Sequence, residues 1–260
     1  MRRAWRRVNY SGLAAVVLCL LVWELGARAH PAFQAYFPPA SRVLGAVVEL
    51  VISGEIVGDT VRTLSRYARG YALAAVVAVA VGVVLGASPF AYSLFDVLIE
   101  FLRPMPSVAT IPVAILFLGV GDSMKVAVAA YGTAWPILLN TVDGVRSIDR
   151  TLIDTGRTLG LSRTQILTKI ALPAALPYVV TGLRISLPIA LIAVTASEMI
   201  AGGNGLGFFI LDEQRAFKVE NMYAGIVLVS LLGYLLNRGF RLLETRGLVW
   251  HTDSRAREAV

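Results

Sequence analysis

The sequence is poor in charge and in the side chains that carry redox or metal chemistry. Charged residues make up 16% of its 260 positions, against about 25% in an ordinary globular domain. Its single cysteine, Cys19, excludes an intrachain disulfide, and its two histidines lack companion ligands for a metal site. It contains no G-x-x-x-x-G-K-S/T phosphate loop, so this chain cannot hydrolyse ATP by that route.

What the sequence has in abundance is apolar residues. They make up 57% of the chain, and several runs approach the roughly 20 residues that a helix needs to cross a bilayer. The short alternating segments of a membrane β-barrel are missing, which leaves helices as the spanning structure. The pattern predicts one membrane domain over residues 1–260 with spans at about 11–28, 68–88, 94–118, 123–143, 175–200 and 223–241.

The third predicted span contains an interruption. The stretch "FLRPMPSVATIP" places Pro104, Pro106 and Pro112 inside it. Each proline lacks a backbone donor and clashes with the preceding helical turn. We therefore expect two helical pieces around a break near these prolines.

The distribution of basic residues predicts the topology. Fourteen Lys or Arg fall in residues 1–10, 143–173 and 238–260, and eight fall in the other loops. Because cytoplasmic loops carry the excess of Lys and Arg, both termini and the segment around 144–174 are expected in the cytoplasm. Arg62, Arg66 and Arg69, just before the second span, oppose this assignment. The net charge of +7 is spread beside apolar runs rather than gathered in a patch, so we expect no nucleic-acid partner.

The first thirty residues fit two descriptions. A basic start, an apolar run and Ala27-Arg28-Ala29 are compatible with a cleaved signal peptide. The apolar run is long for a signal, and six retained spans agree with the charge distribution. We therefore expect the first span to be retained.

A polar, basic segment separates the fourth and fifth spans. It contains the stretch "DTGRTLGLSRTQILTKIALP", residues 154–173. Asp149, a few residues before this stretch, can cap a first helix, and Gly160 can take the left-handed conformation that ends it. Ser162 and Gln165 form a capping box for a second helix, which Pro173 and Pro177 are expected to close. The pattern predicts a helix, a glycine corner and a helix. Composition alone would also allow an amphipathic linker lying on the bilayer.

This segment resembles the EAA motif of ABC importer permeases, which reads E-A-A, three residues, G, nine residues, I, one residue, L-P. Gly160 is followed after nine residues by Ile170, and Leu172 and Pro173 complete the pattern. Asp154, Thr155 and Gly156 stand where Glu-Ala-Ala is usual. They keep an acid followed by two small residues, although Gly156 should loosen the first helix by up to about 1 kcal/mol relative to Ala.

The resemblance extends along most of the chain. Seven ordered blocks are similar to the nitrate/sulfonate/taurine group of these permeases: "FPPASRVLGAV", "LSRYARGYALA", "LRPMPSVATIPVAILFLGVGDSMK", "NTVDGVRSIDRTLIDTGRTLG", "LPAALPYVVTGLRI", "ASEMIAGGNGLGFFI" and "LETRGLVW". The resemblance implies an all-α integral membrane protein of the type I ABC importer permease kind, with six transmembrane helices and a cytoplasmic coupling helix in the loop 144–174. It implies a bacterial inner-membrane location.

The resemblance also implies partners. A second permease subunit, in a homodimer, would complete the pathway, two cytoplasmic ATPases would hold ATP and Mg²⁺, and an extracytoplasmic binding protein would deliver a small anion such as a sulfonate, taurine or nitrate. No cofactor is expected on this chain. The residues implied in ATPase coupling are Asp154, Thr155, Gly156, Leu159, Gly160, Leu161, Ile170, Leu172 and Pro173. Leu159 and Leu161 would lie in a groove of the ATPase.

Ionisable residues within apolar spans suggest a translocation pathway. Arg103, Arg184 and Glu198 would each cost about 2.5–3.5 kcal/mol at a lipid-facing bilayer centre, so we expect them to face the interior of the assembly. On the fifth span, Arg184, Thr195 and Glu198 share one helical stripe with Thr181, Pro188 and Leu191. Arg103 lies at the break with Pro104 and Pro106, where it could meet an anion or serve only a structural role with Glu100 or loose carbonyls.

Two other functions remain open on the sequence alone. A secondary transporter would use the same intramembrane charges as ion sites, and its uptake would depend on an ion gradient. A membrane scaffold or sensor would transport no solute. Neither would need a cytoplasmic ATPase.

Overall fold

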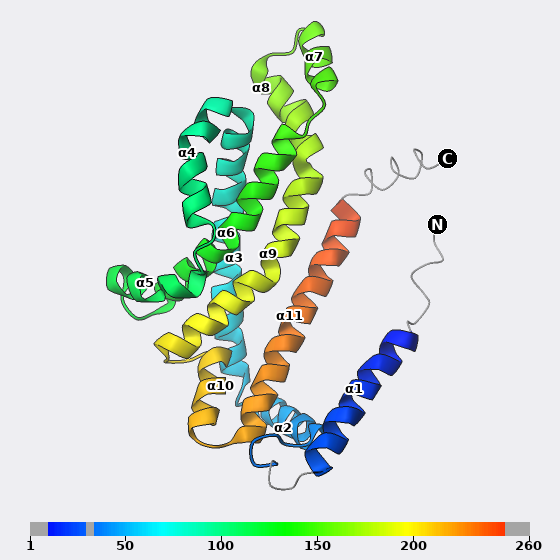
Figure 1. The fold of residues 1–260 in the computed structure, drawn as a ribbon, viewed down its shortest axis with the longest axis vertical. Coiled ribbons are helices and arrows are strands. Elements are labelled where there is room, and N and C mark those ends of the chain that lie inside the picture. Colours follow the sequence, from blue (N-terminus) through cyan, green and yellow to red (C-terminus); the bar gives the residue numbers. More distant parts are fainter. Residues whose placement is uncertain (1–9, 30–33, 248–260) are drawn as a thin grey trace.

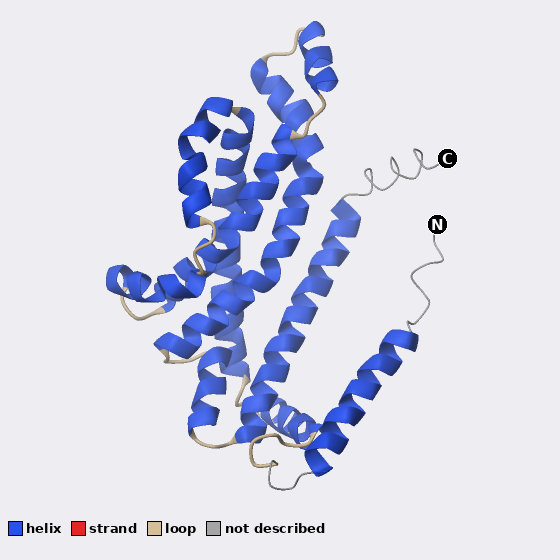
Figure 2. Cartoon of the chain, in the orientation of Figure 1, coloured by secondary structure: helices blue, strands red, loops and turns tan. Residues whose placement is uncertain are grey.

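The computed structural model describes residues 10–29 and 34–247, and all the regular elements in these ranges are helices (Figure 2). They are α1 (Tyr10–Ala29), α2 (Ala40–Ile52), α3 (Val57–Ala87), α4 (Pro89–Leu102), η2 (Ser107–Thr110), α5 (Ile111–Leu118), α6 (Asp122–Arg146), α7 (Arg150–Thr158), α8 (Arg163–Ile166), the π-helical turn η3 (Leu167–Ala171), α9 (Leu172–Ala201), α10 (Leu206–Arg215) and α11 (Val219–Gly247). The basic terminal residues 1–9 and 248–260, used above to predict topology, lie outside these ranges.

Three of the described helices are long and apolar enough to cross a membrane. They are Val57–Ala87, Thr164–Ala201 and Val219–Glu244. A fourth span results if Pro89–Leu102 and Ser107–Leu118 count as one, and these two pieces meet at an angle of 90°. The predicted break at the prolines is therefore confirmed. The count of six spans, which also needs α1 and α6, stays a prediction.

Two predicted helix boundaries were wrong. The helix expected to start at residue 68 starts at Val57, because the side chain of Arg66 is paired inside the protein and can belong to a buried helical face. The prolines at 173 and 177 do not end the second helix of the polar segment, which continues into α9. The π-turn η3, where the N–H of Leu172 donates to the carbonyl of Leu167, widens the helix just before Pro173. That widening accommodates a residue that cannot fit an ordinary helical ladder.

Helices α3, α6 and α9 run side by side and form the centre of the molecule (Figure 1). Small residues allow their backbones to approach closely, as in many membrane helix pairs. Gly82 of α3 faces Thr141 of α6, and a Cβ atom at Gly82 would lie 2.7 Å from that of Thr141. Helix α11 packs on α9 and α10, whereas α1 stands apart from the bundle and meets it near α2 (Figure 1).

The bundle carries different structures at its two ends. The hairpin of α7 and α8 extends from one end, and α2 and α10 lie at the other (Figure 1). Helix α9 runs between these ends, since it is continuous with the hairpin through η3 and terminates beside α10. Any displacement of the hairpin is therefore applied directly to a helix of the central bundle.

The close contact of α3 and α6 predicts that substitutions at two glycines of α3 have different effects on stability. Gly82→Leu should lower the free energy of unfolding by about 1–3 kcal/mol, because the added atoms overpack against Thr141. Gly58→Leu is the matched control, since no atom lies within 4 Å of a Cβ at that position. Thermal unfolding in detergent micelles measures both. Equal melting temperatures for the two variants would contradict this packing.

Candidate functional site

The hairpin begins with the predicted cap. The carboxylate of Asp149 accepts a hydrogen bond from the backbone N–H of Thr151 at 2.8 Å, and α7 follows. This backbone hydrogen bond holds the pKa of Asp149 below its ordinary value. The cap is therefore charged at neutral pH, and its contribution is lost only as the pH falls through that lowered pKa.

The glycine corner is also present. Gly160 has φ of 74°, and the N–H groups of Gly160 and Leu161 donate to the carbonyls of Arg157 and Gly156. These two bonds form a Schellman motif, in which the left-handed residue is normally glycine. After the corner, Ser162 N–H donates to Gln165 Oε1 at 2.9 Å and Gln165 N–H donates to Ser162 Oγ at 3.3 Å, which confirms the capping box.

The predicted coupling residues divide into an inner and an outer set. Gly156 is buried against the second half of the hairpin, where a Cβ atom would lie 2.8 Å from Cδ1 of Ile170 and 3.6 Å from Cδ1 of Leu161. Leu159 points outward, with 74% of its surface exposed. Leu161 therefore closes the hairpin internally, while Leu159 is available to a partner.

The remaining members of that set lie around these residues. Asp154 forms an exposed ion pair with Arg157 at 3.0 Å, and the hydroxyl of Thr155 donates to the carbonyl of Thr151. Leu172 is half-buried and Pro173 is exposed at the start of α9. The backbone and contacts of the hairpin thus match the predicted arrangement, and its role in coupling stays a prediction.

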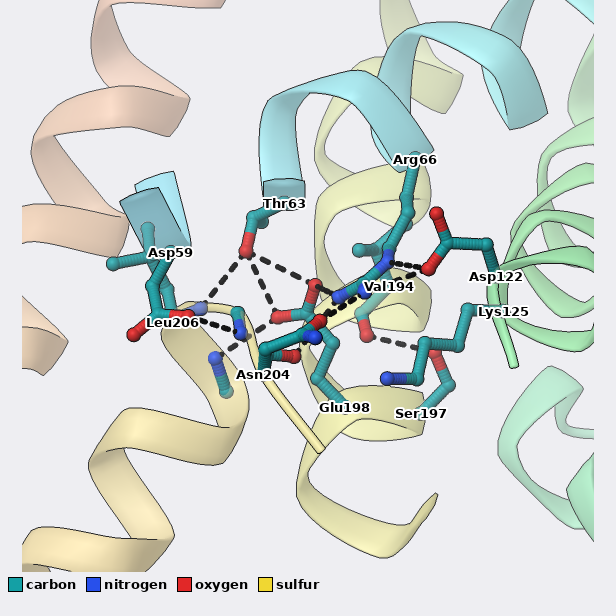
Figure 3. Close-up of polar contacts among 12 residues, drawn as sticks. Asp59, Thr63, Arg66, Asp122, Lys125, Val194, Ser197, Glu198, Asn204 and Leu206 are labelled. Atoms are coloured by element: carbon teal, nitrogen blue, oxygen red, sulfur yellow. Dashed lines mark hydrogen bonds and ion pairs between the residues drawn. The ribbon is translucent and has the colours of Figure 1, made fainter. Parts of the chain in front are cut away.

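The opposite end of the bundle contains a buried ion pair. Glu198 of α9 is fully buried and accepts hydrogen bonds from Arg66 Nη1 at 2.7 Å, from the hydroxyl of Thr63 at 2.9 Å, and from the N–H of Gly207 at 3.0 Å (Figure 3). Arg66 also donates to Asp122 of α6 at 2.8 Å and to the carbonyl of Asn204 at 2.9 Å. Each buried charge is thus both paired and hydrogen-bonded, as burial requires.

The same network holds the loop between α9 and α10. Gly205 N–H donates to Asp59 at 2.7 Å, Leu206 N–H donates to Thr63 at 2.9 Å, and Lys125 Nζ donates to the carbonyl of Gly202 at 2.8 Å. A Cβ atom at Gly205 would overlap the carboxylate of Glu198. Residues 202–205 of the glycine-rich stretch "AGGNGLG" therefore form a turn between α9 and α10 that closes over this carboxylate (Figure 3).

The proline break opens a pocket of about 490 Å³ between the break, α6 and α9. Arg103, Pro104 and Pro106 line it together with Trp135 and Ile189. Arg103 is exposed there, and its side chain has no hydrogen bond or ion pair to the described residues. The structural alternative in which Arg103 pairs with Glu100 is therefore not the arrangement found.

The residues predicted to form one stripe on the fifth span lie in different environments. Thr195 lines an apolar groove of about 350 Å³ between α9 and α11, together with Pro188 and Leu191. Arg184 forms an ion pair with Glu244 at 3.5 Å. Glu198 lies in the buried network rather than along the groove, so the six residues of the stripe do not form one continuous lining.

Sequence reasoning missed the partners of Glu198. Of the residues around Glu198, only Arg66 was noted, as a basic residue just before the second span, and the clustering of Arg66 with Thr63 and Asp122 depends on how distant helices meet. One signal was available, because a carboxylate in an apolar helix needs a cationic partner and Arg66 and Arg69 were the basic residues that opposed the predicted topology. Their position is explained in part by pairing, since Arg66 contacts Glu198 and Asp122, and Arg69 contacts Asp122.

These features define the class of protein: a helical membrane protein with a protruding helical hairpin. A solved structure with this fold is that of the MetNI methionine ABC transporter in an inward-facing conformation, with a TM-score of 0.62, 22% identity, and coverage of 72% of this chain and 93% of that one. At this identity the match concerns the fold alone.

Residues 70–247 match the family described as the binding-protein-dependent transport system inner membrane component, and the chain belongs to that family. It is 29% identical to the taurine transport system permease protein TauC of Escherichia coli K12, over 95% of this chain and 92% of that protein. It is 35% identical to the nitrate import permease protein NrtB of Synechocystis, over 70% of this chain and 66% of that protein. The chain is therefore an inner-membrane permease subunit of an ATP-driven importer, and the ion-driven transporter and scaffold alternatives are set aside.

The buried network predicts a non-additive response to substitution. Arg66→Met should lower the free energy of unfolding by about 3–5 kcal/mol, because it leaves Glu198 as an unpaired buried charge. Glu198→Leu should lower it by less, because Arg66 keeps its ion pair with Asp122. The double variant should lose less than the sum of the two. Arg69→Met, which removes an exposed pair with Asp122, should lose about 1 kcal/mol or less. Unfolding of purified protein in mixed micelles measures all four, and additive losses would contradict the pairing.

Proposed function

We propose that the chain is one of two identical permease subunits that form the pathway of the importer, and that the hairpin of α7 and α8 is its docking element for a separate ATPase subunit. The observation that carries this proposal is the outward position of Leu159 on a capped, glycine-cornered hairpin at one end of the bundle. A large exposed aliphatic side chain at the tip of a polar hairpin suits a partner with an apolar groove. ATP and Mg²⁺ would be bound by that partner, and this chain would bind no cofactor.

The hairpin is suited to transmit movement. It is joined to α9 without a break, and α9 packs along α6 in the centre of the bundle. A shift of the ATPase groove would therefore displace α9 and α6 as packed elements and expose the pathway alternately to the two sides of the membrane. Under this proposal the hairpin and both termini lie in the cytoplasm, which the distribution of basic residues also predicts.

The solute is proposed to be a small anion. The side chain of Arg103 is exposed, has no ion pair within residues 10–29 and 34–247, and lines the pocket at the proline break with Pro104 and Pro106. Two relatives are named for the transport of nitrate and taurine, and each of these solutes carries an oxyanion group. Arg103 and the groove beside Thr195 are the proposed pathway positions. Arg184 and Glu198 would reach a solute only after leaving their present partners.

Docking at the tip of the hairpin predicts loss of ATPase association in two variants. Leu159→Asp places a charge where an apolar contact is needed, and Gly160→Arg adds bulk and strains a residue with φ of 74°. Both should reduce the ATPase that co-purifies with the permease by at least about tenfold, which corresponds to 1.4 kcal/mol. Quantitative immunoblotting of the affinity-purified membrane complex measures this ratio.

Leu159→Met is the control for this experiment, because it keeps an apolar side chain of similar size and should retain the ATPase. Equal amounts of permease in the membrane fraction show that insertion is intact. If the Leu159→Asp and Gly160→Arg proteins retain the ATPase at the wild-type ratio, the docking assignment is wrong.

The pathway assignment predicts a charge requirement at Arg103. Arg103→Gln should lower uptake at least about tenfold without changing ATPase co-purification, whereas Arg103→Lys should keep a large part of the uptake. The measurement is ATP-dependent uptake into proteoliposomes that contain the binding protein, using whichever of nitrate, taurine or an aliphatic sulfonate the wild-type complex transports. Unchanged uptake by Arg103→Gln would exclude Arg103 from the pathway.

A further inference from the structure

The corner between α10 and α11 has an unusual residue at its centre. The N–H of Phe217 donates to the carbonyl of Gln214 at 3.1 Å, and the N–H of Lys218 donates to the carbonyl of Glu213 at 2.9 Å. These bonds form a Schellman motif with Phe217 in the left-handed position, at φ of 56°. Among the described residues, Phe217 is the one non-glycine residue with positive φ.

Glycine would occupy this position without strain. The chain uses glycine at the equivalent position of the other Schellman motif, where Gly160 has φ of 74°. A bulky residue in the left-handed region is strained, and such strain is found where a side chain is needed for a contact outside the local fold. The presence of phenylalanine therefore requires an explanation that helix termination does not give.

Packing within the chain does not give that explanation either. The side chain of Phe217 is 82% exposed, so its ring is not buried in the core. It stands between two pockets of about 470 and 430 Å³ and lines both. Tyr36, which is also largely exposed, lines the second pocket beside it. Phe217 and Tyr36, here called the aromatic ridge, are thus two exposed aromatic residues that share the lining of the second pocket.

The surroundings of the ridge fit a water-soluble protein better than lipid chains. Helix α9 ends at Ala201 and the apolar part of α11 begins at Val219, so the corner lies beyond the ends of two membrane-spanning helices. The hollow on one side is lined by Arg42, Lys218 and Glu220, which acyl chains would not solvate. The corner lies at the end of the molecule opposite the hairpin (Figure 1).

We infer that Phe217 is a docking residue for the solute-binding protein, and that its ring inserts into an apolar hollow on that partner while Tyr36 contacts the rim. This inference rests on the proposed orientation, in which the hairpin is cytoplasmic and this corner is extracytoplasmic. Arg42 and Lys218 already have carboxylate partners, Glu220 at 3.5 Å and Glu213 at 3.5 Å. Arg215 lines the second pocket without an ion pair to the described residues, so an acidic group on the partner is expected to face it. Aromatic residues, phenylalanine among them, are enriched in protein interfaces relative to the rest of the surface.

The Phe217→Gly variant should weaken docking of the binding protein without lowering the stability of the permease. Glycine relieves the strain of the left-handed conformation, so this variant should melt at the same temperature as the wild-type protein or higher. It also removes the ring, so affinity for the binding protein should fall at least about tenfold. The measurement is equilibrium binding of purified solute-binding protein to the permease–ATPase complex in nanodiscs, together with its stimulation of ATP hydrolysis. Basal ATP hydrolysis should not change.

Two controls complete the experiment. Phe217→Tyr should bind within about twofold of wild type, and Ile52→Ala, which removes an equally exposed side chain on α2 outside both pockets, should bind as wild type does. If Phe217→Gly binds the binding protein within twofold of wild type, the inference is overturned, and the ring is a lipid contact or has no partner. Binding to permease alone in nanodiscs can be measured even if the ATPase does not dock at the hairpin, so failure of the proposed function and failure of this inference are distinguishable.

Discussion

The ion pair between Arg66 and Glu198 is the interaction on which one end of the bundle depends. A carboxylate and a guanidinium that are both almost fully buried are stable only when their remaining hydrogen-bonding positions are filled. Thr63, Asp122, Asn204 and the N–H of Gly207 fill them, and these groups come from α3, α6, the loop after α9 and the first turn of α10 (Figure 3). The need to satisfy two charges therefore fixes how α3, α6, α9, α10 and the loop between the last two meet.

The hairpin at the other end of the bundle is stabilised by local contacts instead. The hairpin is held by local caps at Asp149 and Ser162 and by packing of Gly156 beside Ile170, and the charged side chains described in it, Asp154, Arg157 and Lys169, are exposed. Its tip is exposed, and helix α9 connects it directly to the end that the ion pair holds. The hairpin thus folds through its own contacts and leaves its tip exposed to a partner. Because it is joined to α9, a movement of that partner can be converted into a movement of the permease helices.

Local features of the sequence were predicted well because their causes are local. The caps, the corner at Gly160 and the break near Pro104 each depend on a few neighbouring residues, and all are present. The predicted start of α3 at residue 68 was wrong, because Arg66 is paired across the bundle. The predicted end of the second hairpin helix at Pro173 was also wrong, because a π-turn lets the helix continue into α9. The partners of Glu198 and the conformation of Phe217 are set by tertiary contacts that no spacing in the sequence contains. Family resemblance predicted the class of protein, which the family match then established.

Sidedness of the hairpin and its contact with the ATPase can be measured together at one residue. Replacing the single cysteine by Cys19→Ser and introducing Leu159→Cys gives one thiol at the tip of the hairpin. A membrane-impermeant maleimide should label this thiol in inside-out vesicles stripped of ATPase, and added ATPase should protect it. Labelling from the outside of intact cells, or labelling that is indifferent to the ATPase, would contradict the proposed docking and orientation.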